Sequence, residues 1–177
     1  HSAQNFVTAL ERTSCKQIIY LAGLTTGSKL SEHMASRRNV EKVLERGKIS
    51  CTTLRAAIII GSGSASFEII RDLVEKLPIM VAPKWVSSQC QPISVKDIIF
   101  YLKAVLGKQE CMSKVFEVGG PEKITYRDML LRFAKVRGLK RFIIPVPVLS
   151  PRLSSYWLFF ITATSFPLAR ALVISLK

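Results

Sequence analysis

The chain has 177 residues, of which 49% are hydrophobic, and 26 Lys and Arg against 12 Asp and Glu give a formal net charge of +14. This hydrophobic content excludes a disordered chain and is enough for one domain with a core, or for part of one. The positive charge favours an anionic partner, such as a phosphate-bearing cofactor, a nucleotide sugar, a membrane surface or nucleic acid. Specific nucleic-acid binding is not expected, because the basic residues are dispersed and no zinc-finger or RNA-recognition signature is present.

The four cysteines are Cys15, Cys51, Cys90 and Cys111, and no two of them have the C-x-x-C spacing. Neither a metal site nor a redox motif is therefore predicted, and Cys15 and Cys51 are expected to be reduced and buried. Reduced cysteines predict a cytoplasmic location. No signal peptide precedes the first predicted helix, although a missing N-terminal segment would hide one. Because the chain opens on His1, we expect it to be a segment of a longer protein.

The first predicted elements are a helix over 2–13 and a buried strand that starts at Ile18 and ends at Gly23. A helix follows from about Ser31, with one face made of His33, Arg37, Val40 and Leu44. Val40 and Leu44 indicate that this face points inward. His33 and Arg37 would then lie just after the carboxyl end of a strand, where open α/β sheets bind ligands. The alternative is a partly exposed helix on which both side chains meet solvent.

A second buried strand is predicted over 50–60, parallel to the first. The run Gly61-Ser62-Gly63-Ser64-Ala65-Ser66 then opens a helix. It is not interpreted as a dinucleotide fingerprint, because Ser66 occupies the third glycine position and no acid-terminated strand follows at the required distance. It is either a ligand-contacting loop or a strand-to-helix turn without a ligand.

The remaining chain is predicted to contain short strands and capped helices. Extended segments are expected at 79–81 and at Trp85, which either stacks on a ligand or packs at the surface. Ser94 with Asp97, and Thr125 with Asp128, form capping boxes, so neither Asp is assigned any chemistry. The helix after Ser94 has an apolar stripe made of Val95, Ile98, Ile99, Leu102, Val105 and Leu106. An edge strand is predicted at 142–148 because of its prolines. Segment 156–176 is strongly apolar, and Pro167 and Arg170 favour a docking helix over a membrane span.

These segments, in this order, resemble the extended branch of the short-chain dehydrogenase/reductase superfamily, which contains nucleotide-sugar epimerases and dehydratases. LRAAIIIGSG is similar to the family's L-R-x-x-x-x-x-G-x-G segment, and FEVGGPEKITYRDML is similar to its G-G-P-E region. The family's Y-x-x-x-K pair corresponds here to His33 and Arg37, and its catalytic Ser falls on or near Gly23. The resemblance is therefore to atypical members that keep the fold and lose the usual catalytic set. Nothing matches the first strand or the glycine-rich phosphate loop, which would precede His1.

The resemblance implies an α/β fold, a partial Rossmann-type doubly wound parallel sheet with a small C-terminal substrate lobe. Residues 1–110 would form the C-terminal half of an NAD(P)-binding domain with interleaved lobe segments, and 111–177 mainly the lobe and an apolar helix. NAD or NADP would contact Gly23, Arg37, Ala57 and Ile58. A small, possibly nucleotide-linked substrate would contact Gly61, Gly63 and Trp85.

Two functions remain open. In the first, the protein is an NAD(P)-dependent oxidoreductase or epimerase in which His33 exchanges protons, since imidazole titrates near neutral pH. The partner of this chain is then the missing N-terminal half of the same protein. In the second, it is a non-catalytic accessory or scaffold protein that keeps the cofactor, as in accessory subunits of respiratory complexes, and uses its basic surface for protein or membrane contacts.

Overall fold

The computed structural model describes residues 2–24 and 32–146, and the side chains of 32–34, 83–85 and 146 are outside this description. The chain divides into two compact units. The first unit contains His1–Ala57 and Ile93–Gly119, and the second contains Ile58–Pro92 and Gly120–Lys177. Each unit is therefore built from two separate stretches of sequence.

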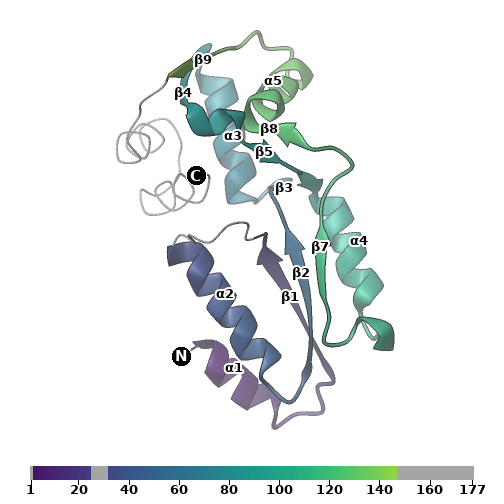
Figure 1. Cartoon of the computed structure of the whole chain (residues 1–177). Helices are drawn as coiled ribbons and strands as arrows, with labels where there is room; N and C mark the ends of the chain where they lie inside the picture. The colour runs from purple at the N-terminus through teal and green to yellow at the C-terminus, as the bar shows by residue number, and fades with distance from the viewer. Residues whose placement is uncertain (1, 25–31, 147–177) are drawn as a thin grey trace. The chain divides into compact units, whose positions relative to one another are not determined.

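The first unit is built on a three-stranded parallel sheet in the order β1 (Gln17–Gly23), β2 (Ser50–Ala56) and β7 (Val115–Val118). Helices α1 (Ser2–Leu10) and α2 (Glu32–Glu45) lie against one face of this sheet (Figure 1). Their contact with the strands is an apolar cluster in which Val7 and Leu44 pack on Ile18 and Cys51. The remaining elements of the unit are β6 (Ile93–Ser94), α4 (Val95–Val105) and the 3-10 helix η2 (Gln109–Cys111).

Helix α4 is tied to the opposite face of the sheet through Gln17. Successive strand side chains alternate between faces, so Gln17 points away from the face that holds Ile18. Its Nε2 donates to the carbonyl of Val105 at 3.1 Å and to the Thr52 hydroxyl at 2.9 Å, and the N–H of Gly107 donates to its Oε1 at 2.8 Å. Helices thus flank both faces of the parallel sheet, which confirms the predicted doubly wound α/β class.

The second unit is organised around one apolar core beneath a two-stranded parallel sheet. Strands β4 (Ile79–Pro83) and β9 (Phe142–Val146) pair in register, and helices α3 (Ala65–Lys76) and α5 (Tyr126–Val136) pack beneath them (Figure 1). The core contains Ile70, Leu73, Val74, Met80, Val86, Leu130 and Ile143. Four short elements complete the unit: β3 (Ile59–Ile60), η1 (Lys84–Ser87), β5 (Gln89–Cys90) and β8 (Ile124–Thr125).

Arg141 joins β9 to the end of α3. Its guanidinium donates to the carbonyl of Val74 at 2.5 Å and to that of Glu75 at 3.2 Å. The last carbonyls of a helix lack intrahelical partners, and a cation there also complements the helix dipole. The N–H of Phe142 donates to the carbonyl of Pro78 at 3.0 Å, so the start of β9 is held at the start of β4.

Several predicted boundaries differ from the structure. The first helix ends at Leu10, before a turn. The strand predicted over 50–60 stops at Ala56, because Gly23 and Val118, the last residues of both neighbouring strands, lie opposite Ala56. Trp85 lies in the 3-10 helix η1 and not in an extended segment, because the ladder with β9 ends at Pro83.

The stripe predicted on α4 is too wide. Ile98 and Val105 are buried and Val95 and Leu102 are partly buried, whereas Ile99 and Leu106 are 51% and 67% exposed. The buried positions recur at three- and four-residue intervals, so the helix presents only a narrow face to the unit.

Candidate functional site

Two small predicted site residues, Gly23 and Ala57, lie at the carboxyl ends of β1 and β2. Gly23 lies opposite Ala56 in the parallel register, and Ala57 follows directly in the chain. The N–H of Leu24 donates to the carbonyl of Ala56 at 2.8 Å, which extends the pairing one residue beyond β1. Parallel α/β sheets bind ligands beyond the carboxyl ends of their strands, and small residues there allow a ligand to approach the backbone.

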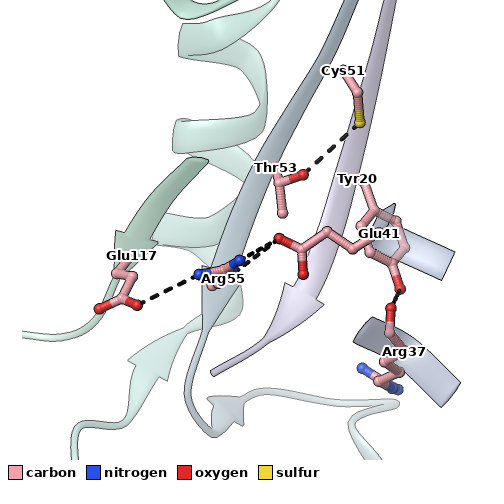
Figure 2. A network of polar contacts seen from close by, with 7 residues as sticks. All are labelled: Tyr20, Arg37, Glu41, Cys51, Thr53, Arg55 and Glu117. Carbon is pink, nitrogen blue, oxygen red and sulfur yellow. Dashed lines mark hydrogen bonds and ion pairs between the residues drawn. The ribbon is translucent and has the colours of Figure 1, made fainter. Parts of the chain in front are cut away.

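Tyr20 connects β1 to the middle of α2. Its phenol donates to the main-chain carbonyl of Arg37 at 3.4 Å (Figure 2). Burial raises the pKa of the Tyr20 phenol, the Arg37 cation lowers it, and the Glu41 carboxylate raises it further. The phenol therefore stays protonated at neutral pH and keeps the hydrogen that this contact requires.

One turn further along α2, Glu41 makes an ion pair with the sheet. Its Oε1 accepts from Nε of Arg55 on β2 at 3.0 Å and from Nη2 of the same residue at 2.6 Å (Figure 2). Glu41 is 3% exposed, and Glu117 on β7 lies 3.9 Å from Nη1 of Arg55. This network, made of Glu41, Arg55 and Glu117, links α2 to two neighbouring strands and fixes how the helix sits on them.

The side chain of Arg37 is exposed, whereas the sequence predicts that its helix face points inward. Leu44 on that face is buried and Val40 is partly buried, but the side chain of Arg37 is exposed and makes no ion pair within the described residues. The inward position is taken instead by Glu41, four residues later on the same side of the helix. The described contact of Arg37 with the sheet is through its main-chain carbonyl, which accepts from Tyr20, three residues before the end of β1. His33 lies in the first turn of α2, and its side chain falls outside the description.

The other predicted site residues belong to the second unit. Ile58 packs against the core of that unit, so packing alone explains an apolar side chain at this position. Gly61 starts a turn in which the N–H of Ser64 donates to its carbonyl at 3.2 Å, and Gly63 has a φ of +82° that favours glycine. Ser64 then caps α3 by accepting from the N–H of Phe67. Trp85 lies on η1, and its side chain is outside the description.

Sequence reasoning missed Tyr20, Glu41 and Arg55 as a connected group. The signal available for Glu41 was its spacing, because positions 33, 37 and 41 recur every four residues on a helix. Because Leu44 indicates that this helix face is buried, a charged residue such as Glu41 on the same face needs a partner of opposite charge. Arg55 offered the complementary signal, since it is the one charged residue of β2.

The two best-defined hollows among the described residues are lined by α4 and by α5, and none of these site residues lines them. A hollow of about 440 Å³ is lined by Lys96, Ile99, Phe100, Lys103 and Ala104, all on α4. Within residues 2–24 and 32–146, no cluster of three or more His, Cys, Asp or Glu side chains is suited to a metal ion. None of the described helices combines the length and hydrophobicity that a membrane crossing needs.

Comparisons with known proteins support the fold. No protein-family model and no curated protein matches the chain. Solved structures do match it. A nucleoside-diphosphate-sugar epimerase from Staphylococcus aureus superposes with a TM-score of 0.72 at 16% identity, over 98% of this chain and 57% of that one. RMD from Pseudomonas aeruginosa, complexed with NADPH, superposes with a TM-score of 0.67 at 13% identity, over 98% of this chain and 70% of that one.

A third structure is the UDP-glucuronic acid 4-epimerase of Bacillus cereus, in complex with UDP-glucuronic acid and NAD. It gives a TM-score of 0.63 at 14% identity, over 99% of this chain and 66% of that one. The chain thus spans 57% to 70% of the length of the three proteins. At these identities the likeness shows a shared fold, and it confirms the predicted Rossmann-type architecture.

Proposed function

We propose that this chain, which has the fold of NAD(P)-dependent sugar-nucleotide epimerases and reductases, binds a nicotinamide dinucleotide at the carboxyl ends of β1 and β2. The observation that carries the proposal is the register that sets Gly23 opposite Ala56, with Ala57 next in the chain, beside a helix whose Arg37 is exposed. Arg37 supplies a cation for a ribose or phosphate group, and Gly23 and Ala57 leave room for a planar ring. A bound nicotinamide would supply hydride transfer.

We assign the pyrophosphate group to the predicted N-terminal half, because the sequence contains no match to the glycine-rich phosphate loop of the resembled family. Among the described strands β1 pairs only with β2, so its other edge is open to a further strand. The predicted N-terminal half, with its glycine-rich phosphate loop, would extend the sheet from this edge. The division into a cofactor-binding half over 1–110 and a substrate lobe over 111–177 remains part of this proposal, as do the cytoplasmic location and a nucleotide-linked substrate.

The choice between enzyme and accessory protein depends on His33. Gly23, His33 and Arg37 stand where the resembled family carries Ser, Tyr and Lys, and an arginine cannot lose a proton as a lysine can. A non-catalytic, cofactor-keeping role is favoured by this departure. If the protein is an enzyme, His33 is its acid/base group, and His33→Ala would abolish NAD(P)H-dependent turnover while leaving dinucleotide binding in place.

Isothermal titration calorimetry with NADH and NADPH tests the cofactor site. We expect the gene product that contains this chain to bind at least one of them, and Arg37→Ala to weaken binding about tenfold, which corresponds to about 1.4 kcal/mol. Arg46→Ala, which removes the same charge just beyond the other end of α2, is the matched control and should bind like the wild type. Absence of binding to both dinucleotides, or equal losses in the two variants, would refute the proposed site.

A further inference from the structure

Helix α4 carries large apolar side chains on the side opposite its buried residues. Ile99 is 51% exposed, and Phe100 and Leu106 are each 67% exposed, although the sequence pattern predicts Ile99 and Leu106 in the core. Lys96 and Lys103 are exposed on the same side of the helix. We call these five residues the outer face of α4, and all of them except Leu106 line the hollow of about 440 Å³.

The outer face of α4 has an ordered arrangement of charge and apolar surface. Lys96 and Lys103 are seven residues apart, close to two turns of an α-helix, so they lie on one line along its axis. Ile99 and Leu106 form a second line on one side of the lysines, and Phe100 lies on their other side. Positions 96, 99, 103 and 106 alternate by three and four residues, which is the spacing by which one helix packs along another.

The two lysines have no acidic partner within the part of the chain that the structure describes. The ion pairs found among residues 2–24 and 32–146 include neither Lys96 nor Lys103. Asp97 is the one acid of α4, and its carboxylate accepts from the Ser94 hydroxyl at 2.7 Å. The complement of the outer face of α4 is therefore a surface with carboxylates set between apolar side chains.

We propose that the outer face of α4 binds an amphipathic helix of a partner protein. Carboxylates of that helix face Lys96 and Lys103, and its apolar side chains pack on Ile99 and Phe100. Burial of the apolar side chains supplies affinity, and the charge pairs set the register and the choice of partner. The proposal is independent of the cofactor site.

Two other occupants fit the outer face of α4 less well. Helices that lie on a membrane carry their charges on the side opposite the apolar residues. Here the lysines lie between apolar rows, so inserting those rows into hydrocarbon would draw both ammonium groups in with them. A second copy of α4 would bring lysines toward lysines, and its one acid, Asp97, is already engaged with Ser94.

Fluorescence anisotropy with a synthetic helical peptide tests the proposal on the gene product that contains this chain. The peptide has three heptads, with Leu and Glu alternating along one face and neutral polar residues elsewhere. We expect it to bind the wild type. Lys103→Glu should weaken binding about tenfold or more through like-charge repulsion, and Phe100→Ala should weaken it about tenfold. Lys103→Glu should also bind a peptide with Lys in place of each Glu more tightly than the wild type does.

Matched controls come from α5. Lys135→Glu makes the same charge reversal at another exposed lysine, and Val136→Ala shortens a valine that is 81% exposed. Both variants should bind the acidic peptide with an affinity close to that of the wild type. All affinities are compared at one ionic strength, because a net charge of +14 attracts any acidic peptide.

Three results would overturn the proposal. The first is that the acidic peptide does not bind the wild type. The second is an equal loss of affinity in Lys103→Glu and Lys135→Glu, because the binding would then be a general attraction to the net charge. The third is that Phe100→Ala leaves peptide binding unchanged but abolishes self-association or binding to anionic vesicles, because a second copy or lipid would then cover the outer face of α4.

Discussion

Among single residues, Glu41 has the most demanding environment in the first unit. It is a carboxylate on an inward helix face, and Arg55 supplies its charge partner through two hydrogen bonds to one oxygen. A buried charge without a partner is strongly unfavourable, whereas the net contribution of an intact pair is small. The pair therefore specifies the position of α2 more than it stabilises the unit. This matters for function because α2 carries both His33 and Arg37.

Glu41→Gln is expected to lower the free energy of unfolding by about 1–3 kcal/mol, since it leaves the partly buried Arg55 without its main charge partner. Urea denaturation followed by circular dichroism measures the change. Glu117→Gln is the matched control, because Glu117 is largely exposed and lies 3.9 Å from Arg55, and its loss should be below about 0.5 kcal/mol. The double variant Glu41→Met with Arg55→Met should recover much of the stability. A loss in Glu117→Gln as large as that in Glu41→Gln would contradict this account.

At the scale of elements, the helix starts are the features that local sequence predicts best. Ser94 and Thr125 were both expected to cap helices, and each accepts from the N–H three residues later, at 3.1 Å and 3.0 Å. Only the Thr125 cap is a reciprocal box, in which the Asp128 carboxylate also accepts from the N–H of Thr125. Hydrogen bonds from the Thr125 hydroxyl and N–H lower the pKa of the Asp128 carboxyl below its ordinary value of 3.8.

A lowered carboxyl pKa in the folded state means that the contribution of Asp128 is present above pH 3.8 and is lost as the pH falls through the folded-state pKa. Asp128→Asn should therefore lower the thermal midpoint near neutral pH, and its difference from the wild type should shrink as the pH falls below 3.8. Differential scanning calorimetry across this range measures both midpoints. Asp97→Asn is the comparison, and it should have the smaller effect near neutrality, since the described bonds to the Asp97 carboxylate include only the Ser94 hydroxyl. If the difference in thermal midpoint between Asp128→Asn and the wild type grew on acidification, the pKa of Asp128 would not be lowered in the folded state.

For the whole molecule, the excess of positive charge is the dominant electrostatic property. With a formal net charge of +14, the positive side chains repel one another in the compact state. Most of the described ion pairs are at the surface, where each contributes little to stability. Neutral salt should therefore stabilise the protein. We expect the thermal midpoint to rise between low salt and about 0.3 M NaCl, where the screening length falls below about 8 Å.

An uncharged osmolyte at matched osmolality is the control for that measurement, and it should raise the midpoint less than the salt does. A midpoint that falls with salt would mean that attractive ion pairs outweigh the self-repulsion. Nicotinamide dinucleotides are themselves anionic, so their binding should be compared at one fixed ionic strength. Otherwise nonspecific attraction to the basic surface would be mistaken for the contribution of Arg37.

The sequence by itself determined the order and type of most elements, the capped helix starts and the α/β class. These follow from apolar periodicity, caps and β-branched runs, which act over a few neighbouring residues. Local patterns could not locate the end of β2, because that end depends on where the neighbouring strands stop. They could not separate the exposed from the buried apolar positions of α4 either, since burial depends on what packs there.

For the candidate site too, some features were predicted from the sequence and others were decided by the tertiary structure. The sequence predicted His33 and Arg37 just after the carboxyl end of a strand, and the resemblance assigned Gly23 and Ala57 to the cofactor. The register sets Gly23 opposite Ala56, the residue before Ala57. Tertiary structure alone decided that Arg37 is exposed, that Glu41 takes the inward position, and that Arg55 reaches it from β2. The physical reason is that helix periodicity defines a face but not its partner. Which charge on that face is buried depends on Arg55, which lies on β2, 14 residues after Glu41.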